Sequence, residues 1–219
     1  MDLRFLRINL FYRLLMPFSD RMRSRRMARF SEMFALRDGT TILDLGGQPM
    51  IWKAVPAKLD ITILNLPGIA NVEHETHHTI RYVEGDACNV VGVGDKSFDV
   101  VFSNSVIEHV GDAGFRSAFA REARRIGKSY WVQTPSKYFP IEPHNGMPFW
   151  WFYPASLRRS IQDGWRKKLP EWTEMIDGTD VVSHEEMTAL FPEADVMVEH
   201  FCGLPKSYIA ASTAGVRAG

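Results

Sequence analysis

Short apolar runs alternate with polar turns along most of the chain, and this pattern predicts strands separated by helices and loops. Seven strands are expected, over residues 41–45, 60–66, 80–83, 99–103, 129–133, 194–200 and 207–211. Four of the five residues from Phe98 to Phe102 are apolar, which is typical of a strand covered on both faces. Such strands occur in the parallel sheets of α/β proteins, in which helices cover both faces.

Apolar residues at helical spacing, together with end signals, predict four helices. They are expected over residues 3–16, 20–35, 114–126 and 183–190. Pro17 ends the first of these helices, and Ser183 with Glu186 has the spacing of a capping box at the start of the last. Residues 49–56 are expected to form a loop or a short helix.

The last two strands are joined by the short link 202–206, so we expect them to pair antiparallel. The other strands alternate with crossover segments, as in parallel sheets. The pattern therefore predicts an α/β, doubly wound, mostly parallel seven-stranded sheet with an antiparallel C-terminal hairpin. At 219 residues the chain has the length of one domain, residues 38–219, preceded by a helical arm over residues 1–37.

Composition narrows the function classes. The net charge is zero, which argues against nucleic acid as a partner. Cys88 and Cys202 form no CxxC pair, so we expect a reducing compartment and neither a disulfide framework nor a structural zinc site. No apolar run approaches the roughly 20 residues that span a bilayer, and arginines interrupt the N-terminal apolar patches where a signal peptide needs a continuous run. These features predict a cytoplasmic protein.

Glycine and polar residues mark the ends of the first two predicted strands. Gly46 and Gly47 follow Asp44, and glycines there let the backbone turn sharply and approach a ligand closely, although a plain tight turn uses the same residues. At the end of the second strand, Asn65 can hold ribose hydroxyls, as polar residues do in nucleoside-binding sheets. The alternative is that Asn65 starts the turn that follows it.

Polar residues also follow the third and fourth predicted strands. Asp86 can accept a hydrogen bond from an adenine amino group, or it can cap the following segment. Asn104 and Ser105 end the fourth strand, and the ionisable pair Glu108 and His109 comes directly after them. Because ligand sites open past the carboxyl ends of parallel strands, we expect these groups to share one site.

Three motifs make the chain similar to a known family. Residues 42–47, 85–87 and 98–110 resemble the class I S-adenosylmethionine-dependent methyltransferases, and within them the broad type 11 methyltransferase-domain group. The resemblance covers roughly residues 30–135 and implies a Rossmann-like sheet with S-adenosylmethionine as the cofactor. It implies cofactor-binding roles for Asp44, Gly46, Gly47, Asn65, Leu66, Asp86, Ala87, Asn104 and Ser105.

The chain departs from the family's pattern, which is an acidic residue followed by x-Gly-x-Gly-x-Gly. Gly46 matches, but Gln48 and Met50 occupy the later glycine positions, and Asn65 replaces the usual acid after the second strand. We expect Trp52 to cover the part of the site that the missing glycines leave open. These departures make a catalytically inactive, methyltransferase-like binding module the alternative function. A nicotinamide-dependent enzyme is disfavoured, because the chain lacks Gly-x-Gly-x-x-Gly.

The candidate catalytic residues are His109, His144 and Glu142. His109 follows the fourth strand, and an imidazole suits proton transfer near neutral pH; the alternative is that His109 shapes the pocket from the first turn of a helix. Glu142 and His144 belong to the aromatic, proline-rich segment 134–155, which we expect to form a substrate loop over the same end of the sheet. The alternative is an aromatic plug that closes a small domain.

The expected reaction is methyl transfer to a small-molecule, sugar or lipid-linked acceptor, with oxygen slightly preferred over nitrogen. Post-strand loops similar to 134–155 occur in methyltransferases that modify polysaccharides and lipids, which is a hint from resemblance. The sequence indicates neither the acceptor nor the oligomeric state. We interpret His74, His77 and His78 as part of a solvated connector rather than as metal ligands, and we expect no metal.

The N-terminal arm is strongly basic. Residues 1–37 hold nine arginines, no lysine and three acidic residues, so their net charge is +6 and the rest of the chain carries −6. The arm can pack over the cofactor site, which is the preferred interpretation, bind an acidic substrate, or lie on the anionic inner face of a membrane. Salt-sensitive vesicle co-sedimentation that is lost on deleting residues 1–28 would identify membrane contact.

Overall fold

The computed structural model describes residues 20–69, 75–142 and 145–217 of the chain. The expected helix at 3–16 lies outside these residues, as do His74 and His144. The second expected helix is present over residues 20–33, two residues shorter than predicted.

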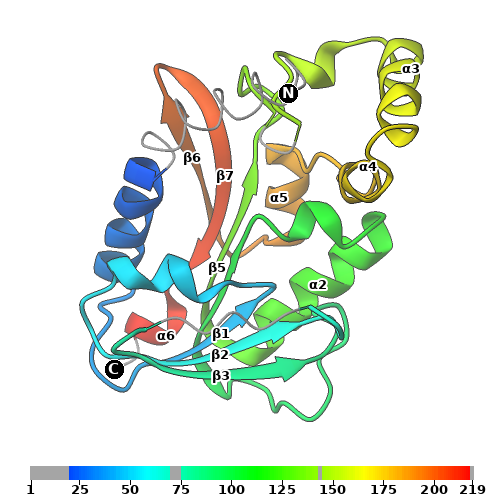
Figure 1. The fold of residues 1–219 in the computed structure, drawn as a ribbon. Coiled ribbons are helices and arrows are strands. Elements are labelled where there is room, and N and C mark those ends of the chain that lie inside the picture. Colours follow the sequence, from blue (N-terminus) through cyan, green and yellow to red (C-terminus); the bar gives the residue numbers. More distant parts are fainter. Residues whose placement is uncertain (1–19, 70–74, 143–144, 218–219) are drawn as a thin grey trace.

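The strands form one seven-stranded sheet in the order β3-β2-β1-β4-β5-β7-β6 (Figure 1). They are β1 (Thr41–Leu45), β2 (Asp60–Asn65), β3 (Thr79–Glu84), β4 (Phe98–Asn104), β5 (Gly127–Pro135), β6 (Asp195–Phe201) and β7 (Leu204–Ser212). The pairs among β1 to β5 are parallel, whereas β7 pairs antiparallel with both β5 and β6. The predicted fold class is confirmed, including the antiparallel C-terminal hairpin.

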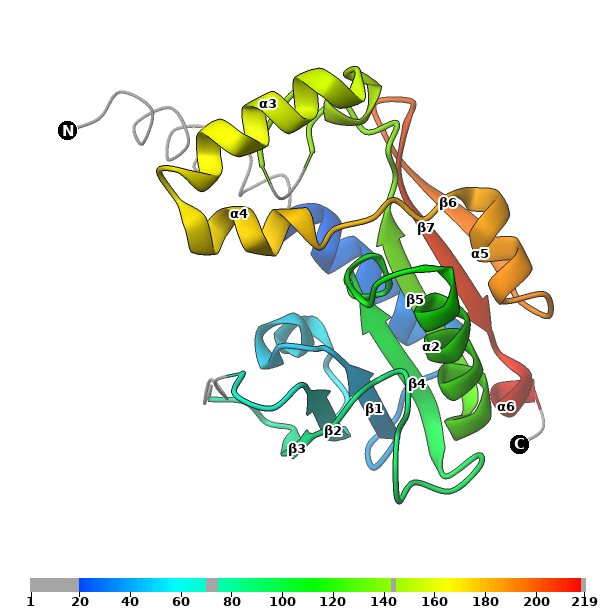
Figure 2. The same ribbon diagram turned by 90° about the vertical axis from the view of Figure 1, so that its right-hand side faces the viewer.

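Two helical layers cover the faces of the sheet (Figure 2). Helices α2 (Ala113–Ile126) and α5 (His184–Leu190) pack on one face, and the helix at 20–33 packs on the other with the 3-10 helix η1 (Pro49–Ala54). Successive residues of a strand point to opposite faces, so Leu43 joins the first layer and Ile42 joins the second. Burial on both faces explains why β1 and β4 appear as nearly continuous apolar runs.

The helix at 20–33 is fixed to the sheet by aromatic packing. Phe30 is fully buried, and its ring centroid lies 5.0 Å from that of Phe102 in β4. This part of the N-terminal arm therefore contributes to the hydrophobic core. Arg21 and Arg25 on the same helix stay exposed, and contact of the arm with an anionic surface remains a prediction.

Two helices between β5 and α5 were not expected from the sequence, α3 (Ala155–Arg166) and α4 (Pro170–Asp177). They lie side by side beyond the carboxyl ends of β4 and β5 (Figure 2). None of the residues of α3 is buried, although Leu157, Ile161 and Trp165 recur every four residues, as on one face of a helix. The remaining short elements are η2 (Ile107–His109), η3 (Trp150–Phe152) and α6 (Ala214–Arg217). None of the helices that the structure describes is long and apolar enough to cross a membrane.

Candidate active site

The turn after β1 depends on two glycines. Gly46 has a φ of +72°, and a Cβ added to it would lie 2.6 Å from a methyl group of Val106. Its N–H donates to the carbonyl of Leu64 in β2, at 2.8 Å. A Cβ on Gly47 would lie 1.8 Å from Oδ2 of Asp44, far inside contact distance. Any larger residue at either position must therefore move the turn.

Asp44 is a buried carboxylic acid directly beneath this turn. It is 0 % exposed, and the indole N–H of Trp52 donates to its Oδ2 at 2.8 Å. Among the described residues no donor reaches Oδ1. Burial raises the pKa of Asp44 to about 7, although the hydrogen bond from Trp52 lowers it. The group therefore exchanges a proton close to neutral pH.

The expectation that Trp52 covers the site is wrong. Trp52 is 0 % exposed, and its ring centroid lies 4.8 Å from that of Phe102 in the layer of the helix at 20–33. The residue instead supports Asp44 from within the core. Trp52 lies in η1, the short helix expected over residues 49–56, and is one of its two buried residues.

The predicted residues of β2 and β3 lie at neighbouring strand ends. The buried Asn65 donates from Nδ2 to the carbonyl of Gly47 at 3.3 Å, so it ties the end of β2 to the glycine turn. Leu66 is exposed, and Ala87 packs against the α2-side core. Asp86 is exposed and accepts from the backbone N–H of Cys88 at 2.8 Å, as a turn-forming residue does.

Asn104 and Ser105 at the end of β4 belong to a buried polar network. Oδ1 of Asn104 accepts from Nη1 of Arg26 at 2.6 Å. Ser105 has a φ of +59°, and its hydroxyl donates to Oε1 of Gln133 at 3.0 Å. Arg26 is 8 % exposed and also pairs with Glu199 in β6. The network therefore joins the helix at 20–33 to the β4 corner through three strands.

Burial alone would raise the pKa of Glu199, but hydrogen bonds from Arg26 and Ser207 outweigh burial and lower the pKa. Arg26 was missed from the sequence because it is one of nine arginines in the arm and no pattern distinguishes it.

Replacing Arg26 with methionine is expected to lower the free energy of unfolding by about 3 kcal/mol, because it leaves Glu199 and Asn104 without their buried partner. Urea unfolding measures the change. Arg25→Met is the matched control, since Arg25 is exposed on the same helix and should change stability by less than about 0.5 kcal/mol. Equal stability of the two variants would contradict the role of the network.

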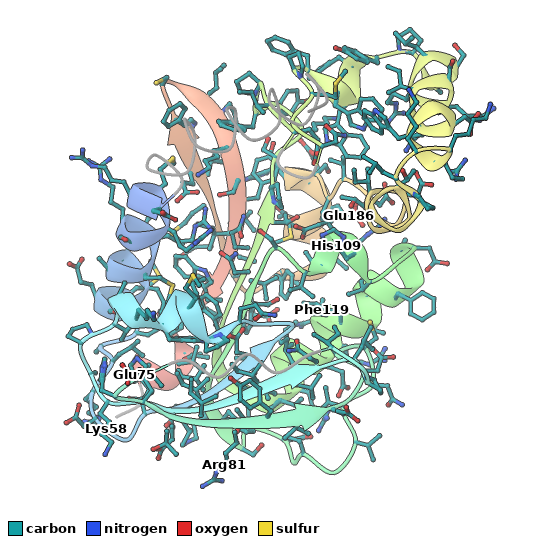
Figure 3. All side chains as sticks on the ribbon, in the orientation of Figure 1. Lys58, Glu75, Arg81, His109, Phe119 and Glu186 are labelled. Carbon is teal, nitrogen blue, oxygen red and sulfur yellow. The ribbon has the colours of Figure 1, made fainter. Side chains whose placement is uncertain are left out.

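Glu108 and His109 point in different directions from η2. Glu108 is 2 % exposed and accepts from the hydroxyl of Thr134 at 3.1 Å. His109 is exposed, and its Nδ1 lies 3.3 Å from the hydroxyl of Thr179. In Figure 3 His109 lies near the middle of the molecule, between Glu186 and Phe119, and well away from Lys58 and Arg81. The histidine is thus accessible at the end of the sheet where a substrate can reach it.

Two adjoining cavities lie between α4 and the segment that follows β5. The first is lined by residues at the ends of β4 and β5, including Glu108 and Ser136. The second has a volume of about 220 Å³ and extends toward α3 and α4. Both are lined by Glu142, Trp151, Thr179 and Asp180, so a ligand in the second cavity adjoins the first.

Glu142 is 4 % exposed and accepts from the backbone N–H of Asn145 at 2.8 Å, which shapes the turn of the aromatic segment. It lines both cavities, whereas His109 lies beside them through Thr179.

Arg116 of α2 clamps the wall of these cavities. It is 7 % exposed, and it pairs with Glu186 at 2.6 Å and with Asp180 at 2.9 Å. Ser183 accepts from the N–H of Glu186 at 3.1 Å, so the predicted N-cap of α5 is confirmed, while the Glu186 side chain is held by Arg116. Burial alone would lower the pKa of Arg116, but Glu186 and Asp180 raise it. The clamp holds the 179–181 segment against α2.

His78 is not part of a solvated connector, so that interpretation is wrong for this residue. It is 6 % exposed, its Nδ1 accepts from the N–H of Leu59 at 3.2 Å, and its Nε2 lies 2.9 Å from the carbonyl of Trp52. Burial lowers the pKa of His78, which favours the neutral ring that this pairing requires. Within the described residues, no group of three His, Cys, Asp or Glu residues is arranged to hold a metal ion.

Comparisons with known proteins agree with this arrangement. Residues 61–129, which run from β2 to the start of β5, match the family model of a methyltransferase domain, Methyltransf_11. A search of curated proteins finds no match.

Two solved structures share the fold. An O-methyltransferase family protein from Burkholderia thailandensis superposes with a TM-score of 0.52 and 14% identity, over 94% of this chain and 58% of that one. Phosphoethanolamine N-methyltransferase 2 of Haemonchus contortus, solved with S-adenosyl-L-methionine, superposes with a TM-score of 0.51 and 15% identity, over 80% of this chain and 38% of that one. The predicted resemblance is thus confirmed: residues 61–129 match a methyltransferase-domain model, and the chain shares the fold of these two methyltransferases.

Proposed function

We propose that this protein transfers a methyl group from S-adenosylmethionine to a small-molecule, sugar or lipid-linked acceptor, with oxygen preferred over nitrogen as the methyl acceptor. The observation that carries the proposal is the turn at Gly46 and Gly47, which lies over the buried carboxyl group of Asp44 at the end of β1. Strand β1 pairs with β2, where the match to the methyltransferase-domain model begins. Glycines permit a ligand to approach the backbone closely, and a carboxylate favours a cationic ligand. Both properties fit a sulfonium cofactor.

The residues that would hold the cofactor lie at the ends of the first three strands. Gly47 and Asn65 are joined by a hydrogen bond, and Asp86 is exposed at the next strand end. The side chains of Asn104 and Ser105 are engaged by Arg26 and Gln133. We therefore assign Asn104 and Ser105 to shaping the β4 corner, which adjoins the cofactor, rather than to contact through their side chains.

The cofactor supplies a methyl group that is already activated for transfer. The protein must align the acceptor with that group, exclude water and remove a proton from the acceptor where the chemistry needs it. His109 is the proposed base, because it is exposed at the carboxyl end of the sheet and lies beside the cavities through Thr179. The buried Glu142 lines the acceptor cavities and orders the turn of the aromatic segment.

Replacing His109 with alanine is expected to reduce methyl transfer by about 10²- to 10⁴-fold, because general bases contribute that much to proton abstraction. Cofactor affinity, measured by calorimetry with S-adenosylhomocysteine, should stay unchanged. His200→Ala is the matched control, since His200 is an exposed histidine on β6. Turnover that is unaffected by His109→Ala would reject the assignment of the base.

A labelling experiment tests the proposed activity before the acceptor is known. The protein is incubated with S-[methyl-³H]adenosylmethionine and with small-molecule, lipid and polysaccharide fractions from cells that produce it. Label is expected in one fraction and should be lost with His109→Ala. Alkali-stable, acid-stable methyl ethers in the product would support oxygen as the acceptor atom, and methylamines would overturn that preference.

The alternative is a catalytically inactive, methyltransferase-like binding module. It is favoured by the irregular turn, in which Gln48 and Met50 occupy glycine positions. Cofactor binding without label in any fraction would support this alternative. A nicotinamide cofactor is disfavoured by the absence of Gly-x-Gly-x-x-Gly from the sequence.

A further inference from the structure

Two buried hydrogen-bond donors without acceptors line the larger cavity. Asn145 is 8 % exposed, and its Nδ2 has no acceptor among the described residues. The buried Nε of Arg158 also has none in the described part of the chain. Donors that are shut away from water without a partner cost free energy. A ligand with oxygen atoms that reach both donors would remove that cost.

The same cavity has an aromatic wall. Trp151 lines it, and the guanidinium of Arg158 lies 5.4 Å from the centroid of the Trp151 ring. Trp150 also lines the cavity and stacks on Trp165 of α3, with ring centroids 5.3 Å apart. These contacts hold the indoles in place. Flat, immobilised indoles favour ligands with an apolar ring face, such as the C–H face of a sugar.

The charges around the cavity select against charged ligands. Asp177 pairs with Arg166 and accepts from Gln162, while Asp180 pairs with Arg116. Together with Glu142 they place three carboxylates on the lining, which disfavours an anion. Arg158 on the same lining offsets the charge of Glu142. Asp177 and Asp180 are already paired with arginines, so the lining has no excess negative charge to attract a cation. Carboxylate oxygens and amide donors side by side suit hydroxyl groups, which both donate and accept.

We infer that this cavity binds a neutral, polyhydroxylated ring, that is, a sugar unit of the methyl acceptor. The inference rests on the proposed methyl transfer for its role. The cavity, of about 220 Å³, far exceeds the ~10–15 Å³ that one water needs. Through the lining it shares with the smaller cavity, which reaches Glu108 and Ser136 at the ends of β4 and β5, a sugar held here adjoins the methyl-transfer site.

Saturation-transfer NMR on the full chain tests the inference with four neutral probes, the methyl α-glycosides of glucose, galactose, mannose and rhamnose. We expect saturation to pass from the protein to at least one of these glycosides when the glycoside is present at millimolar concentration. Asn145→Asp keeps the oxygen that accepts from the N–H of Met147 but replaces the free donor with an acceptor. It should weaken binding of that glycoside by about tenfold or more, as expected for one lost hydrogen bond.

Arg158→Lys keeps the charge, removes Nε–H and should have a similar effect. Arg159→Lys is the matched control on an exposed neighbour of the same helix and should bind as the wild type does. Thermal unfolding of each variant shows that it is folded. No saturation of any glycoside, or equal affinities for wild type and both cavity variants, would overturn the inference. Saturation of methyl phosphate without any glycoside would overturn the ligand class.

Calorimetry with S-adenosylhomocysteine on the same preparations separates this inference from the proposed function. Wild type and Asn145→Asp are expected to bind S-adenosylhomocysteine equally. Cofactor binding without glycoside binding would refute the sugar site alone. Glycoside binding without cofactor binding would refute the proposed function and leave a sugar-binding module.

Discussion

Gly47→Ala is expected to lower the affinity for S-adenosylmethionine by at least about a hundredfold, a loss of about 2.7 kcal/mol. The added Cβ would lie 1.8 Å from Oδ2 of Asp44, and that side chain is fully buried and held by Trp52. The turn must therefore shift away from the carboxyl group. Its N–H groups and the Gly47 carbonyl, which Asn65 contacts, must shift with it. Calorimetry with S-adenosylmethionine measures the loss.

Gly94→Ala provides the matched control. A Cβ on Gly94 would meet nothing within 4 Å, and its φ lies outside the left-handed region. The control should bind the cofactor as the wild type does, and circular dichroism should show both variants folded. A Gly47→Ala variant that keeps wild-type affinity would show that the turn after β1 does not approach the cofactor.

Asp44→Asn is expected to stabilise the fold at pH 8 and to weaken cofactor binding. The pKa of Asp44 is raised from 3.8 to about 7 by burial. Between these values the folded state keeps a proton that the unfolded state has released, so the free energy of unfolding falls as pH rises from about 4 to 7. Above pH 7 the full cost of the buried charge is present, on the order of 2–4 kcal/mol. An amide carries no such cost and still accepts from Trp52.

Thermal unfolding checks this prediction. At pH 8 the midpoint of Asp44→Asn should lie on the order of 5–10 °C above that of the wild type, and the gain should disappear near pH 4. Affinity for S-adenosylmethionine should fall by about tenfold or more at pH 8, because a cationic cofactor favours the charged carboxylate. Equal unfolding midpoints of the two proteins at pH 8 would show that burial does not raise the pKa of Asp44.

The sheet could be predicted because buried strands leave a clear mark. Four of the five residues 98–102 are apolar, because α2 and the helix at 20–33 cover β4 from opposite sides. The glycines at 46–47 marked the first strand end in the same way, because only the turn demands them. Helix α3 also carries a pattern, since Leu157, Ile161 and Trp165 recur every four residues, but this helix was not predicted. Features imposed by burial or backbone geometry were therefore visible in the sequence.

Pairings between distant residues were not visible. Arg26 meets Asn104 across 78 positions, and Arg116 meets Glu186 across 70. Trp52 and His78 have no periodicity that distinguishes a core hydrogen-bonding role from an exposed one. The strand ends thus gave the place of the site, while its supporting contacts depended on how the layers fold together.

Binding of S-adenosylmethionine to the full-length chain, measured by isothermal titration calorimetry beside S-adenosylhomocysteine and NAD, tests the central claim most directly. We predict one site per chain that binds S-adenosylmethionine and S-adenosylhomocysteine, with no heat from NAD. Binding of NAD alone, or of none of the three, would contradict an S-adenosylmethionine site at the carboxyl ends of β1 to β4.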